Sequence, residues 1–370
     1  MITRTASKRA KMDVTSTVTK SPSPDSGSDG VVSAQPTSFI PFQTGPSLER
    51  IPDDVLLEVV SYLPIHLTTF NNRPILIHPM YVIRCTTPAR TPILRALSQT
   101  SRLLRSRCLP LAWQRTAFWG PNFRRLDSSF DESIGKRTYS SIHVLKACPY
   151  LLPLIRTVSV MLTTYQKAEI IPAFAACLAT LPNLNTIQVV NMEWGIQTAL
   201  KNAFRGKRFP SVRKISLPSP AHEIIKMCPN LEEVTCVDEH GGCKIVQSLV
   251  AAKCHQVRML KGITTPLTRL VDLVPNLTHA SVAKGSDMTP LTGFPFLDTI
   301  EILIDYHIQV DLPLSEFAAL DIKKARDILK GNKSKAEKTV VLTKSNNLWN
   351  YRSYEFDSVQ RYMTRETVKV

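Results

Sequence analysis

Six side chains that can bind a metal ion lie close together in the sequence, between residues 228 and 255. They are Cys228, Cys236, His240, Cys243, Cys254 and His255. A structural zinc site needs four such ligands in tetrahedral geometry, and the spacings here match no zinc finger. We expect Cys228 and Cys236 to be small buried apolar residues, because aliphatic residues fill the corresponding positions of similar segments in the chain. The sequence therefore predicts no metal site and no cofactor.

Catalytic motifs that depend on a fixed spacing are absent from the sequence. It contains no G-x-x-x-x-G-K-[ST] loop for phosphates, no H-E-x-x-H pair for zinc hydrolysis and no G-x-S-x-G turn for a nucleophilic serine. We also find no convincing pair of general acid and general base. The prediction is a protein that is not itself an enzyme and has no catalytic residue.

The chain of 370 residues is basic, with a formal net charge of +16 from 46 Lys and Arg against 30 Asp and Glu. Its hydrophobic fraction of 43% and charged fraction of 21% are ordinary for a globular protein, and its length allows more than one domain. A basic chain can attract nucleic acid, acidic membrane surfaces or acidic proteins. Because the charge is spread along the chain without a dense basic block that contains aromatic residues, we rank nucleic-acid binding well below protein binding.

The cysteines and the apolar segments indicate the compartment. None of the eight cysteines forms a C-x-x-C pair, and the first residues lack the apolar run of a secretory signal. No uninterrupted apolar run approaches the ~20 residues that span a bilayer. We expect reduced thiols, no membrane span, and an intracellular protein that is cytoplasmic, nuclear or both. Residues 1–46 are rich in Ser, Thr, Pro and Asp, which predicts a disordered tail.

A short amphipathic helix is predicted after Pro52. Pro52 and Asp53 are typical of a helix start, and Pro64 ends the pattern. Apolar residues recur at spacings of three and four and form one face, which consists of Val55, Leu56, Val59, Val60 and Leu63. Such a helix is too short to be stable alone in water. Its apolar face must therefore bind another surface.

This segment resembles the opening of an F-box. Residues 51–63 read IPDDVLLEVVSYL, and the F-box pattern is Leu-Pro, any residue, an acidic residue, a run of aliphatic residues and then Ser-Tyr-Leu. Residues 94–106 resemble the second F-box helix, and residues 109–113, which read LPLAW, resemble the third. The combination is most similar to F-box proteins that are abundant in mushroom-forming (basidiomycete) fungi. The resemblance implies a three-helix domain that docks a Skp-type adaptor and, through it, a cullin.

The resemblance also implies the limits of this domain and its contact residues. The F-box domain would span residues 47–120 and contain a long internal loop at 64–91, where a compact F-box uses fewer residues. Four prolines between residues 64 and 91 exclude a continuous helix there. The residues expected to dock the adaptor are Ile51, Pro52, Val55, Leu56, Val59 and Leu63, with Leu97 and Leu104 behind them.

A short sequence motif, here called the phrase, is repeated after the F-box-like part of the chain. It consists of a small or apolar residue, Pro, any residue, an apolar residue, two polar positions and an alternating apolar strand. Copies occur at residues 181–189, 209–217, 228–236, 274–282 and 294–302, with a version lacking Pro at 254–260. The second residues of the copies are separated by 28, 19, 26, 20 and 20 positions, within or next to the spacing of leucine-rich repeats.

These repeats resemble degenerate leucine-rich repeats and predict an irregular α/β solenoid over residues 140–320. In each unit the residues two and five places after the Pro position should point inward, such as Leu184 and Ile187 or Leu231 and Val234. The segments before the phrase, such as 170–180 and 221–227, are compatible with helix. The alternative is an α/β domain in which the spacing is coincidental.

The C-terminal part, residues 321–370, is predicted to cap the solenoid. We expect a helix over 317–329, a basic loop over 330–338, a strand over 339–343 and an aromatic segment after it. The alternative is that the basic loop and the aromatic residues form a ligand site.

The sequence as a whole favours a substrate-receptor subunit of a cullin–RING (SCF-type) ubiquitin ligase, with an unknown target protein bound by the repeats. Two alternatives remain open at this point. One is a leucine-rich-repeat scaffold without adaptor binding, and the other is a basic nucleic-acid-associated protein.

Overall fold

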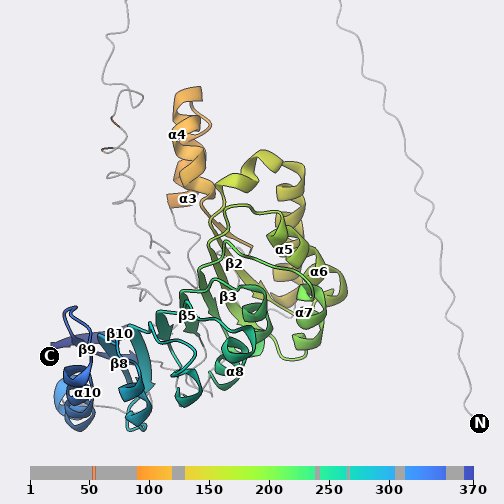
Figure 1. Cartoon of the computed structure of the whole chain (residues 1–370). Coiled ribbons are helices and arrows are strands. Elements are labelled where there is room, and N and C mark those ends of the chain that lie inside the picture. Colours follow the sequence, from red (N-terminus) through yellow and green to blue (C-terminus); the bar gives the residue numbers. More distant parts are fainter. Residues whose placement is uncertain are drawn as a thin grey trace, which may run out of the picture. The chain divides into compact units, whose positions relative to one another are not determined.

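Ten strands form one open sheet in which the strand order is the order of the chain, in the part that the computed structural model describes (Figure 1). The described residues are 52, 55, 90–118, 130–237, 242–263, 265, 267–304, 313–346 and 362–370. The strands are β1 (Arg115–Ala117), β2 (Thr157–Leu162), β3 (Thr186–Met192), β4 (Lys214–Leu217), β5 (Glu233–Cys236), β6 (Met259–Lys261), β7 (His279–Ala283), β8 (Thr299–Ile304), β9 (Thr339–Asn346) and β10 (Tyr362–Lys369). Neighbours from β1 to β9 run parallel, and β10 is antiparallel to β9. The protein is therefore a mixed α/β structure with a mostly parallel sheet.

Helices connect consecutive strands, and α5 to α8 lie along one side of the sheet (Figure 1). The α-helices are α3 (Arg90–Leu97), α4 (Arg102–Trp113), α5 (Phe130–Ala147), α6 (Lys167–Ala179), α7 (Gln197–Phe204), α8 (Cys243–Ala252), α9 (Leu314–Phe317) and α10 (Ala319–Gly331). The 3₁₀ helices are η2 (Pro149–Leu154), η3 (Ser219–Met227), η4 (Thr268–Leu270) and η5 (Thr289–Gly293). A parallel neighbour requires a crossover connection, so the chain returns along the helix side after each strand.

The backbone carbonyl of the residue just before a strand accepts hydrogen bonds from two backbone amides of the next unit. The carbonyl of Asn185 accepts from the amides of Arg213 and Lys214 at 2.8 and 3.1 Å, and the carbonyl of Arg213 accepts from Glu232 and Glu233 at 2.7 and 3.0 Å. The carbonyls of Gln114, Arg156, Glu232, Arg258 and Thr278 each accept two amides of the next unit in the same way. Because the same bonds recur at the same place, the strands begin in register across the sheet.

The predicted strands and their inward residues are confirmed. Each copy of the phrase begins its strand four residues after the Pro position, as in β3 after Pro182 and β5 after Pro229. Leu184, Ile187, Leu231 and Val234 are at most 1% exposed. One continuous core runs from Phe118 to Leu342 and fills the space between the strands and the helices.

The number of residues between the second positions of successive copies, here called a step, determines which kind of helix lies between them. The two long steps of 28 and 26 residues hold the α-helices α7 and α8, whereas the short steps of 19 and 20 residues hold η3, η4 and η5. A 3₁₀ helix rises about 2.0 Å per residue against 1.5 Å for an α-helix, so fewer residues cover the same distance. The helix-compatible segment 221–227 is therefore 3₁₀ (η3), while the predicted helix at 170–180 is confirmed as α6.

The helices before the sheet differ from the predicted boundaries. The sequence indicated one helix over 94–106 and another over 109–113. The structure instead ends α3 at Leu97 and runs α4 continuously from Arg102 to Trp113, with Pro110 inside it. The Oγ of Ser101 accepts the Leu104 amide at 3.2 Å, so Ser101 caps a new helix within the block read as one. Pro110 costs the helix one amide donor without breaking it.

The C-terminal helix and strand lie close to their predicted places. The expected helix at 317–329 is α10 with the short α9 before it, and the expected strand at 339–343 is β9, which pairs with β8. The aromatic segment after β9, the tail at 1–46 and the loop residues 64–89 lie outside the described residues. β1, β2, α5 and β10 were not predicted.

Candidate binding surfaces

The helices α3 and α4 pack on each other and enclose a small apolar cluster. Its buried members are Leu94, Leu104, Cys108 and Ala112, and Leu97, Leu111 and Trp113 pack against them. Trp113 also packs against the main core, and the guanidinium of Arg95 lies 4.6 Å from the centre of its ring. The chain continues from Trp113 almost directly into β1, so this cluster is tied to the first edge of the sheet.

The predicted adaptor-docking residues are described in part. Pro52 is exposed, and Val55 lies in a helix with 43% of its surface exposed. Leu97 is half-buried, and Leu104 is only 4% exposed and packs within the α3–α4 cluster. The structure thus brings Leu97 and Leu104 together. Ile51, Leu56, Val59 and Leu63 lie outside the described residues.

Two apolar side chains on α3 and α4 were not among the predicted contacts. Ile93 is 38% exposed and Leu103 is 47% exposed, next to the buried Leu94 and Leu104. A large apolar side chain in water is a typical anchor for a partner surface. The helical periodicity of the two blocks could have identified both, since each is one position away from a buried residue.

The face of the sheet turned away from the helices carries rows of polar side chains. In β2, β4, β5 and β8 buried and half-exposed or exposed residues alternate, so that every second side chain leaves the core. One row, polar except at Met259, consists of Thr157, Thr186, Lys214, Glu233, Met259, His279, Thr299 and Thr339. Ser159 and Gln188, in the adjacent row, are joined by a hydrogen bond of 2.6 Å. This face therefore offers hydrogen-bonding groups over many strands.

Glu233 is the centre of a charged group on this face. Its carboxylate lies 2.9 Å from the Nζ of Lys214 and 3.2 Å from the Nζ of Lys261, so that three neighbouring strands contribute. Burial alone would raise the pKa of Glu233, but the two lysines lower it below the ordinary value. The carboxylate is therefore ionised at neutral pH.

Glu301 is the centre of a second and more buried group. Ser281 donates to its carboxylate at 2.6 Å, Thr343 donates at 2.8 Å, and the Nε2 of His279 lies at 3.4 Å. The side chain of Glu301 is 14% exposed and that of His279 is 9% exposed. Burial would raise the pKa of Glu301, but the hydrogen bonds from His279, Ser281 and Thr343 lower it to about 2. Ser281 bonds to the carboxylate rather than to an imidazole, so the group lacks the geometry of a nucleophilic triad.

The low pKa of Glu301 predicts a specific dependence of stability on pH. Because the folded-state pKa is lowered from 4.5 to about 2, the contribution of Glu301 is complete above pH 5 and is lost as the pH falls toward 2. At about 1.4 kcal/mol per pH unit, this contribution amounts to about 3 kcal/mol. We expect the free energy of unfolding, measured with denaturant between pH 5 and pH 3, to fall more steeply in the wild type than in Glu301→Gln. Parallel curves would contradict the assignment.

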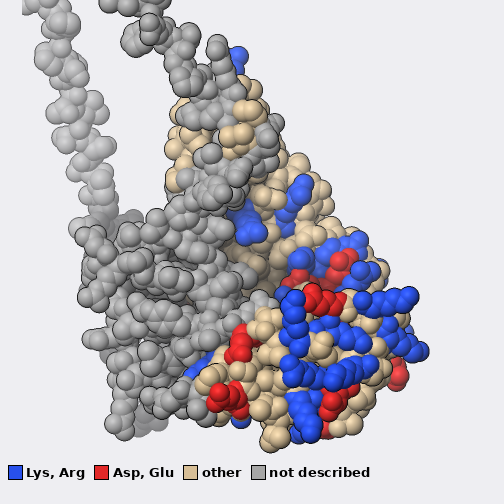
Figure 2. Space-filling view, turned by 90° about the vertical axis from the view of Figure 1, so that its left-hand side faces the viewer, with Lys and Arg blue, Asp and Glu red and all other residues tan. Residues whose placement is uncertain are grey.

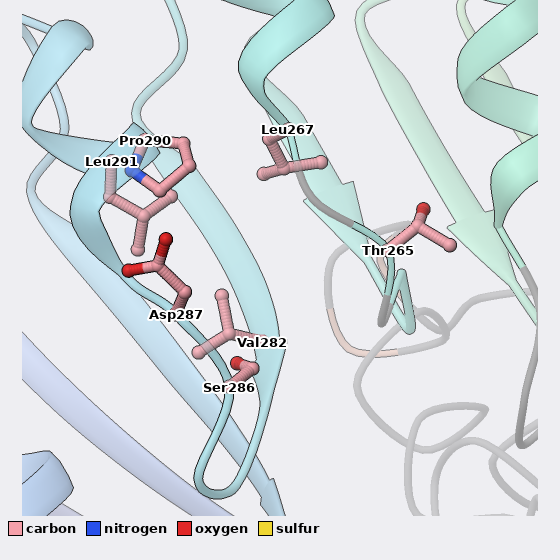
Figure 3. Close-up of a pocket in the computed structure, with 7 residues that line it drawn as sticks. All are labelled: Thr265, Leu267, Val282, Ser286, Asp287, Pro290 and Leu291. Atoms are coloured by element: carbon pink, nitrogen blue, oxygen red, sulfur yellow. The ribbon is translucent and has the colours of Figure 1, made fainter.

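A small pocket lies between the segment after β6 and the segment after β7 (Figure 3). It is lined by Thr265, Leu267, Val282, Ser286, Asp287, Pro290 and Leu291. Figure 3 shows Thr265 and Leu267 on one side and the other five residues on the opposite side. The cavity of about 40 Å³ has room for no more than a few water molecules. The buried Oγ1 of Thr265 has no hydrogen-bond partner, so a water molecule would be well placed there. The pocket is too small for a substrate.

Of the four cysteines that opened the sequence analysis, three lie in the core and Cys243 is exposed. Cys228, Cys236 and Cys254 are at most 1% exposed, which confirms the prediction that Cys228 and Cys236 are buried. Burial raises the pKa of the Cys254 thiol to about 11 and that of the Cys228 thiol further, so these thiols are protonated at neutral pH. Within the described residues, no group of three or more His, Cys, Asp or Glu side chains could hold a metal ion. His240 lies outside them.

Neither a protein-family model nor a curated protein matches this sequence. The functional argument therefore depends on the geometry of the surfaces above. In the described part of the chain, no helix combines the length and the apolar character needed to cross a membrane.

Proposed function

We propose that the protein is a substrate-receptor subunit of a cullin–RING (SCF-type) ubiquitin ligase. In this proposal the segment 47–120 is an F-box that docks a Skp-type adaptor. The observation that carries it is the apolar cluster of α3 and α4, which is separate from the main core and leaves Ile93 and Leu103 exposed beside it. A pair of helices with its own core and exposed apolar residues is suited to complete a helical interface with a partner.

The sheet supports the second half of the proposal, a leucine-rich-repeat-like solenoid that binds a target protein. Its strands follow the chain order, and the carbonyl before a strand is a shared acceptor for the next unit. The strands β2 to β5, β7 and β8 each begin four residues after a Pro. Units that contact only their sequence neighbours are typical of solenoids. The polar rows, including the group around Glu233, would form the target surface, while the core side is closed by helices.

The proposed mechanism is proximity. Docking the adaptor at one end and a target on the sheet holds the target near a ubiquitin-conjugating enzyme, which converts a bimolecular encounter into a nearly unimolecular reaction. No side chain of this protein needs to take part in the chemistry. The proposed location is intracellular, where the other subunits would be found.

Adaptor binding is tested with an exposed residue of the predicted docking helix. We expect the full-length chain to retain purified Skp-type adaptor in a pull-down and the Val55→Asp variant to bind at least a hundredfold more weakly, because a charge would enter an apolar interface. Val55 is 43% exposed, so the variant should fold normally.

Val144→Asp is the matched control, since Val144 on α5 is 45% exposed and lies outside the proposed F-box. The control should bind the adaptor like the wild type. An equal loss of adaptor affinity in both variants, or no adaptor binding by the wild type, would contradict the proposal. The protein would then be a repeat scaffold without adaptor docking.

A further inference from the structure

A groove lies between α6 and α7, on the helix side of the sheet and away from the polar rows. It is lined by Lys167, Ala168, Pro172, Ala199, Asn202, Ala203 and Lys207. Its open volume of about 490 Å³ is in the range of peptide and ligand sites. The lining consists of three alanines, a proline and an asparagine with two lysines, so the groove combines small side chains with positive charge.

The surroundings of the groove are strongly basic. No Asp or Glu occurs between Glu193 and Glu223, whereas this stretch contains six Lys and Arg residues. Of these, Lys201, Arg205 and Arg208 are exposed and Lys207 is half-buried.

The acidic side chains nearby are already engaged. Glu193 accepts the amide of Thr164 at 2.6 Å, and Glu223 pairs with Lys226 at 2.9 Å. Glu169, on α6, accepts a hydrogen bond from Tyr139. The Nζ of Lys167 donates to the carbonyl of Gly195 at 3.2 Å, which leaves further donors of this ammonium group for an anion. These carboxylates keep their charge, but between Glu193 and Glu223 the sequence holds six basic side chains and no acidic one, so the groove has a positive potential.

The lining of the groove also offers a backbone acceptor. Pro172 has no N–H, so the carbonyl of Ala168, four residues earlier in α6, lacks its usual helical donor. Ala168 and Pro172 both line the groove, and Ala168 is exposed. A ligand that carries N–H groups beside its negative charges could satisfy this carbonyl.

We propose that this groove binds an acidic peptide segment of a partner protein. Carboxylates of the segment would pair with Lys167, Lys207, Arg205 and Arg208, a backbone N–H would reach the Ala168 carbonyl, and small side chains would rest on the alanines. A nucleic acid fits less well, because single-stranded nucleic acid needs aromatic side chains for stacking and no aromatic residue lines the groove. The inference does not rest on the proposed ligase function, since the groove lies on the other side of the sheet from the polar rows.

The test measures binding of a fluorescein-labelled peptide of alternating Glu and Ala to the full-length chain by fluorescence anisotropy. The double variant Arg205→Glu/Arg208→Glu is expected to bind about tenfold or more weakly, because both side chains are exposed close in sequence to the lining residue Lys207 and the reversal replaces attraction by repulsion. Ala168→Glu, which puts a carboxylate into the lining of the groove, should weaken binding as well.

The matched control reverses the same number of charges on another basic surface. Lys323 and Lys324 are exposed on α10, which lies at the lower left of Figure 1, on the side that faces the viewer in Figure 2. Lysine and arginine side chains are gathered on that face, with a few acidic side chains between them (Figure 2). The variant Lys323→Glu/Lys324→Glu should bind the peptide nearly as well as the wild type.

Three results would overturn the proposal. The first is that the wild type does not bind the peptide, and the second is that the groove and α10 double variants lose peptide affinity equally. The third is that a single-stranded DNA of equal charge binds more tightly than the peptide and that Ala168→Glu leaves the DNA affinity unchanged. The last result would assign the basic surface to nucleic acid, and its affinity should then fall linearly with the logarithm of the salt concentration.

Discussion

Replacement of Glu301 by alanine is expected to lower the free energy of unfolding by about 3 kcal/mol at pH 7. The substitution removes the acceptor of Ser281 and Thr343 and the partner of His279, while these groups stay in a site where Glu301 itself is only 14% exposed. Polar groups that stay buried without a partner lose their hydration without compensation, which is the main source of the cost. Denaturant unfolding at pH 7 measures the change directly.

Glu232→Ala is the control for this prediction. Glu232 lies next to β5, is 45% exposed at its side chain and pairs with Arg213 at 3.5 Å. An exposed ion pair contributes little, so the expected change is below about 1 kcal/mol. If Glu301→Ala and Glu232→Ala cost the same, the buried carboxylate group does not stabilise the sheet as described.

Replacement of Phe204 by alanine is expected to cost about 3 to 5 kcal/mol, the usual range for removing a buried phenyl ring. Phe204 is fully buried at the end of α7, and its ring centre lies 6.3 Å from that of Phe174 and 5.8 Å from that of Phe209. These rings belong to consecutive units, so the cavity would open at a junction between units. The measurement is the midpoint and slope of denaturant unfolding.

Phe296→Ala is the control with the same chemical change at an exposed site. Phe296 is 45% exposed in the turn before β8. Its loss should change stability by no more than about 0.5 kcal/mol. A loss of stability in Phe204→Ala as small as that in Phe296→Ala would show that the contacts of Phe204 with Phe174 and Phe209 do not hold the units together.

The strands could be predicted from the sequence because each unit repeats the same short sequence pattern. A Pro position, an inward residue two places later and an alternating strand recur, and one unit that follows the same rule, at Pro153 before β2, was missed although its signal is present. Ile155, two places after Pro153, is fully buried, as the rule requires. The pairing of β2 with β3 in the sheet places β2 in the series.

The helix boundaries and the binding surfaces were harder to predict, because they depend on contacts between distant residues. The break between α3 and α4 comes from the cap at Ser101, which competes with a periodic apolar pattern that continues across it. Glu301 and its three partners come from three strands, β7, β8 and β9, and nothing in their local sequence indicates the contact. The groove between α6 and α7 likewise needs two helices that are separated by β3 in the chain.

The strand order has a consequence for how the chain is made. Each described strand hydrogen-bonds only to the strands directly before and after it in the sequence, so no pairing skips over a unit. None of these strands therefore has to wait for a pairing partner from a later and distant part of the chain. A ribosome releases the chain from its N-terminal end, and each new unit finds its template already in place. We therefore expect the sheet to grow during synthesis, one unit at a time, before the last strands have been translated.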